Sequence, residues 1–264
     1  MDGSARLVTL TRIGFAARGL IYIVIAWLVI HAGRPEDPSG ALEHVAQGGR
    51  LFMMLVVAGL IAYGFWRLSD SIFNIEGHPP DAKGLRQRLG AGGSGVVHLL
   101  LAWQAVRLIR GQPASGGGGQ DGTGAAISLL GPDELALPVA GAVLIGVGAY
   151  QMIKAAKAEF LRHLEPRVAQ EPWAKWAGRL GYAARGIIFL ISGFFLLQAG
   201  LGGEGPQRGT IAEALRWLDN PWDLLVAVGL LAFGLYSLIE ARFRILHGVP
   251  IKGIVDGSVR PTLH

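Results

Sequence analysis

The sequence contains no cysteine, and this absence excludes both a disulfide framework and a metal site built on thiolates. Charged side chains are scarce as well. Asp, Glu, Lys and Arg make up 16% of the 264 residues, whereas soluble domains contain about 25%. Hydrophobic residues reach 51%, and the mean hydropathy is +0.41. This composition is typical of a protein that lies within a lipid bilayer, and it leaves little sequence for a soluble domain.

Six apolar stretches are each long enough to cross the hydrocarbon core of a bilayer, which takes about 20 helical residues. Their approximate bounds are Thr11 to Ala32, Leu51 to Phe73, Leu89 to Ile109, Leu135 to Ala155, Ala177 to Ala199, and Asp223 to Phe243. We therefore predict an all-α fold, an integral membrane six-helix bundle. It forms a single membrane domain over residues 1–264, with the lipid bilayer as its surroundings.

Basic residues are distributed unevenly between the connections. With the spans placed as above, 18 of the 24 Lys and Arg residues fall in the two terminal segments and in every second connection. Cytoplasmic loops of membrane proteins carry such an excess. The pattern predicts a multi-pass protein of the inner (plasma) membrane with both termini in the cytoplasm. It also accounts for the net charge of +5 without a nucleic-acid partner.

An internal repeat organises the chain. RIGFAARGLIY begins at Arg12, RLGYAARGIIF begins at Arg179, and a diverged copy begins at Arg88. The second helices repeat too, because GLIAYGFW at Gly59 matches GLLAFGLY at Gly229. Each unit enters and leaves the membrane on the same side, so we predict three parallel two-helix repeats with pseudo-threefold symmetry about the membrane normal. The units cover approximately residues 8–78, 84–160 and 175–248.

Short amphipathic helices are expected between the two spans of the outer units. In residues 40–46 and 209–215, apolar side chains recur three and four positions apart. This spacing gives a helix one apolar face, so we expect both segments to lie on the outer surface of the membrane.

The repeated pattern, Arg-[Ile/Leu]-Gly-x4-Gly with an aromatic residue three positions later, resembles a known family. This is the bacterial integral inner-membrane family built from three copies of domain of unknown function 1206. The resemblance covers nearly the whole chain, and the Ala-Ala-Arg-Gly segments ending at Gly19 and Gly186 are its most specific part. It implies six membrane spans in a bacterial protein, and it implies no established activity.

Two arginines stand inside predicted spans. Arg18 and Arg185 follow the first arginine of their copies by six residues, about 9 Å along a helix. A charge at that depth is costly unless it finds a partner or reaches the lipid phosphates. Asp70 and Glu240 occupy equivalent places in the second helices, and the unit that lacks the arginine has Lys154 there. We therefore expect structural pairs within each unit, Arg18 with Asp70 and Arg185 with Glu240. Contact with lipid phosphate is the alternative.

The second unit departs from the repeat through polar residues. Ser94 stands where the other units have arginine, His98 where they have an aromatic ring, and Gln104 where they have apolar side chains. Lys154 replaces the acid. A position that breaks a shared pattern is free to serve a task performed once. We predict that Ser94, His98, Gln104 and Lys154 line a polar path; neutral drift is the alternative.

Residues 92–95 read GGSG, the GxSG pattern that rhomboid-type intramembrane serine proteases carry at their nucleophile. A serine nucleophile needs a base within hydrogen-bond distance. The fourth to sixth predicted spans contain no histidine, and His98 lies one turn after Ser94 on the same helix, which favours a local hydrogen bond. We interpret the motif as fortuitous and predict no catalytic residue.

The other histidines do not form facing pairs within the predicted spans. His44, His78, His163 and His247 fall in connections or at helix ends, where solvated side chains are the rule. A haem or metal held inside a helical bundle needs ligands that face one another at membrane depth. We therefore predict no cofactor and no metal site.

Three classes of function remain open. A small-solute or ion transporter or channel is the first interpretation, a structural or accessory envelope protein without catalysis is the second, and an intramembrane enzyme is the third. The sequence leaves the substrate open, and it does not decide between a homo-oligomer and another protein partner.

Overall fold

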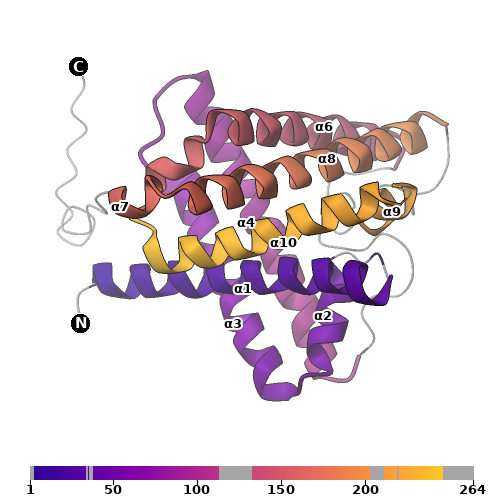
Figure 1. Ribbon diagram of the computed structural model, residues 1–264, viewed down its shortest axis with the longest axis horizontal. Helices are drawn as coiled ribbons and strands as arrows, with labels where there is room; N and C mark the ends of the chain where they lie inside the picture. The colour runs from indigo at the N-terminus through magenta and orange to yellow at the C-terminus, as the bar shows by residue number, and fades with distance from the viewer. Residues whose placement is uncertain are drawn as a thin grey trace.

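The computed structural model describes residues 3–33, 35, 38–112, 133–202, 211–218 and 220–245. Figure 1 shows their arrangement. The long helices are α1 (Gly3–Ala32), α3 (Arg50–Phe73), α4 (Ala82–Ile109), α6 (Asp133–Lys157), α8 (Pro172–Gly202) and α10 (Trp222–Phe243). The short ones are α2 (Pro38–Ala46), η1 (Glu159–His163), α7 (Pro166–Ala169) and α9 (Ile211–Trp217). All six long helices are apolar enough to cross a membrane, so the all-α six-helix membrane architecture is confirmed.

The connection between α3 and α4 is fixed by its own polar side chains. Asn74 ends α3 in a left-handed conformation with φ 53°. Its side-chain amide donates to the carbonyl of His78 at 2.9 Å and accepts from the N–H of the same residue at 2.7 Å. Asp81 caps α4 by accepting from the backbone N–H of Gly84 at 2.8 Å. Because of this cap, α4 begins well before Leu89, where the predicted span started.

The two short helices expected between the spans of the outer units are present. α2 packs against α1, α3 and α4, and it buries Leu42 and Val45. α9 packs against α8 and α10, and it buries Ala214 and Leu215. Both helices therefore use the apolar face that the spacing predicted.

The long helices pack neighbour to neighbour in the order α6, α8, α10, α1, α3, α4. In Figure 1, α1, α6, α8 and α10 run side by side, whereas α3 and α4 cross them steeply. α4 and α6 belong to one repeat unit, but among the described helices they are not a closely packed pair. Gly14 and Gly181 press against the second helix of their own units, while the equivalent Gly90 has no neighbour within 4 Å of the place a Cβ would occupy. The pseudo-threefold arrangement therefore stays a prediction.

Contacts between units repeat one glycine crossing three times. Gly19 meets Gly234, Gly95 meets Gly64, and Gly186 meets Gly148; a Cβ on any of them would lie 2.8–3.1 Å from the carbonyl oxygen of its partner. Within lipid, small residues allow helix backbones to approach this closely. In each crossing the first helix of one unit lies against the second helix of the preceding unit, counted cyclically. This offset decides which polar residues meet.

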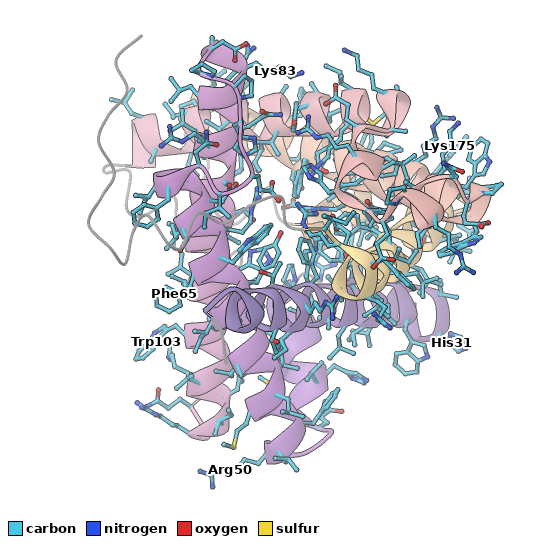
Figure 2. The ribbon with its side chains drawn as sticks, turned by 90° about the vertical axis from the view of Figure 1, so that its left-hand side faces the viewer. His31, Arg50, Phe65, Lys83, Trp103 and Lys175 are labelled. Atoms are coloured by element: carbon cyan, nitrogen blue, oxygen red, sulfur yellow. The ribbon has the colours of Figure 1, made fainter. Side chains whose placement is uncertain are left out.

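The helix ends divide into two sets. The connections 74–81 and 158–171 meet residues 244–245 where α3, α6 and α10 end and α4 and α8 begin. We call this the basic end because exposed Lys and Arg residues, among them Lys83, Arg86, Lys157 and Lys175, lie beside these connections. In Figure 2, Lys83, near the start of α4, lies at the top, and Arg50, at the start of α3, lies at the bottom. Phe65 and Trp103 project outward from α3 and α4 and are 60% and 57% exposed, as expected for side chains that contact lipid.

Candidate functional site

Arg18 belongs to a cluster of charged side chains inside the helix bundle, which we call the charged core. Its other members are Arg67, Asp70, Glu76, Glu240 and Arg244. The side chain of Arg18 is buried, and its Nη2 lies 2.5 Å from Oε2 of Glu240. Nη1 donates to the hydroxyl of Tyr63 at 2.7 Å, and Nε donates to the hydroxyl of Ser237 at 3.1 Å. α1, α3 and α10 thus supply one hydrogen-bonded group around a single guanidinium, which offsets the cost of burying its charge.

The expected pairing of Arg18 with Asp70 is therefore wrong, and so is that of Arg185 with Glu240. The helix offset gives the reason. Because α1 crosses α10 at Gly19 and Gly234, Arg18 faces the acid of the third unit instead of the acid of its own. The second unit has Ser94 in place of the arginine and Lys154 in place of the acid. These two differences do not come from the loss of one ion pair within that unit.

Asp70 takes other partners. Its carboxylate lies 3.1 Å from Nε2 of His78 and 3.6 Å from Nη1 of Arg67, and it accepts from the backbone N–H of Glu76 at 2.8 Å. Ser94 stands at the position equivalent to Arg18, on the helix that packs against α3, and offers no charge to this acid. His78 is buried, which corrects the expectation that it is a solvated histidine.

A network of ion pairs extends from Arg18 across the basic end. Arg244 lies 2.5 Å from Glu240 and also pairs with Glu76, which is 3.8 Å from Arg67. Burial by itself raises the pKa of Glu76, but the charges of Arg244 and Arg67 outweigh it and hold that pKa well below its usual range. Burial and the charge of Arg244 lower the pKa of His163 to about 3, so this imidazole is neutral.

Asp70, Glu76 and His78 place ligand atoms within 4.8 Å of one another, a spacing that a metal ion could use. Their surroundings argue against one. The network contains three carboxylates and three guanidiniums, so its formal charges already cancel. A divalent cation would add two uncompensated charges in a buried position.

Arg185 has a different environment from its counterpart Arg18. Its Cζ lies 4.4 Å from the ring centroid of Phe233, 4.9 Å from that of Phe189 and 5.1 Å from that of Tyr22. Its Nε is buried without a hydrogen-bond partner, and no carboxylate of the described residues pairs with it. Aromatic faces attract a guanidinium, but they do not neutralise its charge.

Lys154 occupies on α6 the place that Glu240 occupies on α10. Its Nζ lies 4.5 Å from the ring centroid of Tyr182, and within the described part of the chain it pairs with no carboxylate. α6 crosses α8 at Gly148 and Gly186, as α10 crosses α1 at the equivalent glycines. The interface of α1 with α10 joins the cation Arg18 to the acid Glu240. At the equivalent positions, α6 and α8 carry two cations, Lys154 and Arg185.

The predicted polar path is brought together in part. Nδ1 of His98 donates to the backbone carbonyl of Ser94 at 2.7 Å, and its ring centroid is 4.4 Å from that of Tyr63. Gln104 is buried about two turns further along α4. No described contact joins Lys154 to the other three residues.

Several residues of this core escaped prediction. Glu76, Arg67 and Arg244 lie outside the repeated motif or on its flank, so no pattern marked them. The first arginine of the motif recurs in all three copies, at Arg12, Arg88 and Arg179, but the repeat alone did not indicate its role. Arg88 donates to the carbonyls of Ser71 and Ile72, so it caps the end of α3. Arg179 donates to the carbonyl of Ala156, so it caps the end of α6.

Comparisons with known proteins agree with the repeat. A family model described as Domain of Unknown Function (DUF1206) matches residues 13–74, 89–158 and 180–244. The uncharacterized protein YxxB of Bacillus subtilis (strain 168) is 29% identical over 248 residues, which cover 88% of this chain and 90% of the relative. No solved structure matches the chain.

Proposed function

The chain belongs to the DUF1206 family, and from its charged core we propose that it moves a small anionic solute across the membrane. In this proposal Arg185 and Lys154 form the binding region, and His98 is a further polar residue of the path. We further propose that the membrane is the bacterial inner membrane and that the basic end faces the cytoplasm. The 18 of 24 basic residues on that side support this orientation.

One observation supports a negative charge on the transported solute. Among the described residues, the three carboxylates of the core each serve guanidiniums of the network, and Arg185 and Lys154 have none. Two uncompensated cations within membrane-spanning helices are costly, and such residues usually mark a substrate or ion pathway. An anion bound beside these two cations would supply the missing negative charge.

The packing of the second unit supports access to these residues. α4 and α6 are the two helices of one unit that do not pack closely, and a Cβ on Gly90 of α4 would have no neighbour within 4 Å. Lys154 and His98 are only partly buried, as is Arg185. A solute could therefore approach the binding region without first separating a packed interface.

Weak retention also suits transport, because a carried ion must leave as well as enter. Arg18 is held by Glu240, Ser237 and Tyr63, and it has little capacity left for a ligand. Arg185 is held by aromatic faces, so its donors stay available to an anion. We assign the anion contact to Arg185 and not to Arg18.

We propose no catalytic role for the GxSG motif. His98 donates from Nδ1 to the carbonyl oxygen of Ser94, a contact within one helix that gives a hydroxyl nucleophile no base. A non-transporting accessory role is the second candidate. The ion network favours it, because these ion pairs tie α1, α3 and α10 together at the basic end.

The test is an efflux assay with the purified full-length chain in phosphatidylcholine vesicles loaded with chloride, phosphate or acetate and clamped with valinomycin and potassium. We expect efflux of at least one anion and its loss in Arg185→Gln. Arg50→Gln, which removes an exposed cation far from the core, is the matched control and should transport normally. No efflux from the wild type, or equal efflux from Arg185→Gln, would leave the accessory role.

A further inference from the structure

At the basic end, the corner between the end of α6 and the start of α8 carries cations and indole rings together. Arg179 lies between the two helices: its Nη2 donates to the carbonyl of Ala156 at 3.1 Å, and its Cζ lies 5.7 Å from the ring centroid of Trp176. Lys157, the next residue after Ala156, and Lys175, one turn before Arg179, are exposed. Figure 2 shows Lys175 at the rim of the molecule.

The charges of this corner are not neutralised within the described part of the chain. Neither Lys157 nor Lys175 forms an ion pair there, and the one described hydrogen-bond acceptor of Arg179 is a neutral carbonyl. Glu159, two residues after Lys157, lies 4.0 Å from Nζ of Lys83 instead, and the carboxylate of Glu171, one turn before Lys175, pairs with none of the three cations. Three positive charges therefore lack a carboxylate partner here, and those of Lys157 and Lys175 are exposed.

The indoles fix the depth of this corner in the membrane. Trp173 and Trp176 are 51% and 56% exposed, and Leu180 lies one turn beyond them on the same face of α8. Tryptophan prefers the level of the lipid head groups, with apolar side chains further in. The cations consequently stand at the height of the lipid phosphates in the leaflet at the basic end.

We propose that this corner is a binding site for the head group of an anionic phospholipid. The lipid phosphate lies between Lys157, Lys175 and Arg179, and its acyl chains run along Trp176 and the lipid-facing side of α8. A phosphate free in solution lacks the apolar half of this contact. The site is separate from the proposed transport core and does not depend on it.

The equivalent corner of the first two units provides a contrast within the same molecule. Arg88 donates to the carbonyls of Ser71 and Ile72, as Arg179 does to Ala156. The positions of Lys157 and Trp176 are taken there by Phe73 and Leu85. The helix-capping arginine is thus shared by the two corners, whereas the cation at position 157 and the indole at position 176 are present only in the second of them.

Native mass spectrometry of the delipidated full-length chain, titrated with dioleoyl phosphatidylglycerol or dioleoyl phosphatidylcholine, tests the site. We expect clear preference for phosphatidylglycerol. Its affinity should fall roughly thirtyfold in the double variant Lys157→Gln/Lys175→Gln, since each basic residue near an anionic lipid surface contributes about 1 kcal/mol of binding free energy. Arg50→Gln/Arg110→Gln removes the same charge from exposed positions at the other end of the helices and should bind as the wild type does.

Two further experiments identify the ligand of this corner. Phe73→Lys/Leu85→Trp rebuilds the corner beside Arg88 and should add a second phosphatidylglycerol. Millimolar inorganic phosphate should not displace the lipid. Equal affinity for the two lipids, an unchanged Lys157→Gln/Lys175→Gln variant, or displacement by phosphate would each overturn the assignment.

Discussion

Replacing Arg18 and Glu240 with glutamine, singly and together, should reveal a strong coupling between two helices that belong to different repeat units. The 2.5 Å contact is buried on both sides, and Tyr63 and Ser237 complete the hydrogen bonds of the guanidinium. Breaking one partner of such a pair leaves an uncompensated buried charge, which costs about 3–5 kcal/mol. Removing both partners should recover part of that loss.

The assay is a double-mutant cycle on unfolding in detergent. We expect an interaction energy of about 1–3 kcal/mol for Arg18 with Glu240. The same cycle with Asp70→Asn is the internal control, because Asp70 bonds to His78 and Arg67 instead. Its interaction energy with Arg18→Gln should stay below about 0.5 kcal/mol. A larger coupling to Asp70 than to Glu240 would show that the helices pair within units.

Gly95→Ala should destabilise the chain by about 1–3 kcal/mol in detergent melting, because its Cβ would lie 2.9 Å from the Gly64 carbonyl oxygen, whereas Gly90→Ala, in open space, should be neutral or slightly stabilising. The pKa of Glu76 is lower in the folded chain than its unfolded value of 4.5, so the ionised carboxylate stabilises the fold at any pH above 4.5. The free energy of unfolding of the wild type should therefore fall as the pH drops below 4.5, and it should fall by less in Glu76→Gln. Cysteine at Ser39 should react with an impermeant thiol reagent in intact cells, and cysteine at Ala82 should not. Labelling in the reverse order would invert the orientation.

Much of the architecture followed from the sequence because bilayer crossing imposes strong local demands. A span needs about 20 apolar residues, and this demand is met wherever the chain crosses. The two copies of the Ala-Ala-Arg-Gly segment, with the diverged copy at Arg88 between them, revealed the three units, and the spacing of apolar residues predicted α2 and α9. These features depend on short stretches of chain, so a single sequence can reveal them.

The pairing of charges could not be read in the same way. Equivalent positions in a repeat say which residues correspond, but not whether a unit packs on itself or on its neighbour. The Gly19 and Gly234 crossing decides that question for Arg18, and it rests on contacts between segments more than 200 residues apart. The open side at Gly90 was equally hidden, because Gly90 fits the motif although its partner helix does not approach.

The charge balance between α6 and α8 is tested most directly by anion efflux from vesicles that contain Lys154→Glu. This substitution places opposite Arg185 the acid that Glu240 places opposite Arg18, so Arg185 should gain an internal partner in place of the solute. We expect Lys154→Glu to abolish efflux and Lys154→Gln to retain part of it, although both remove the lysine. Efflux from Lys154→Glu that equals or exceeds that from Lys154→Gln would contradict an anion site at Arg185.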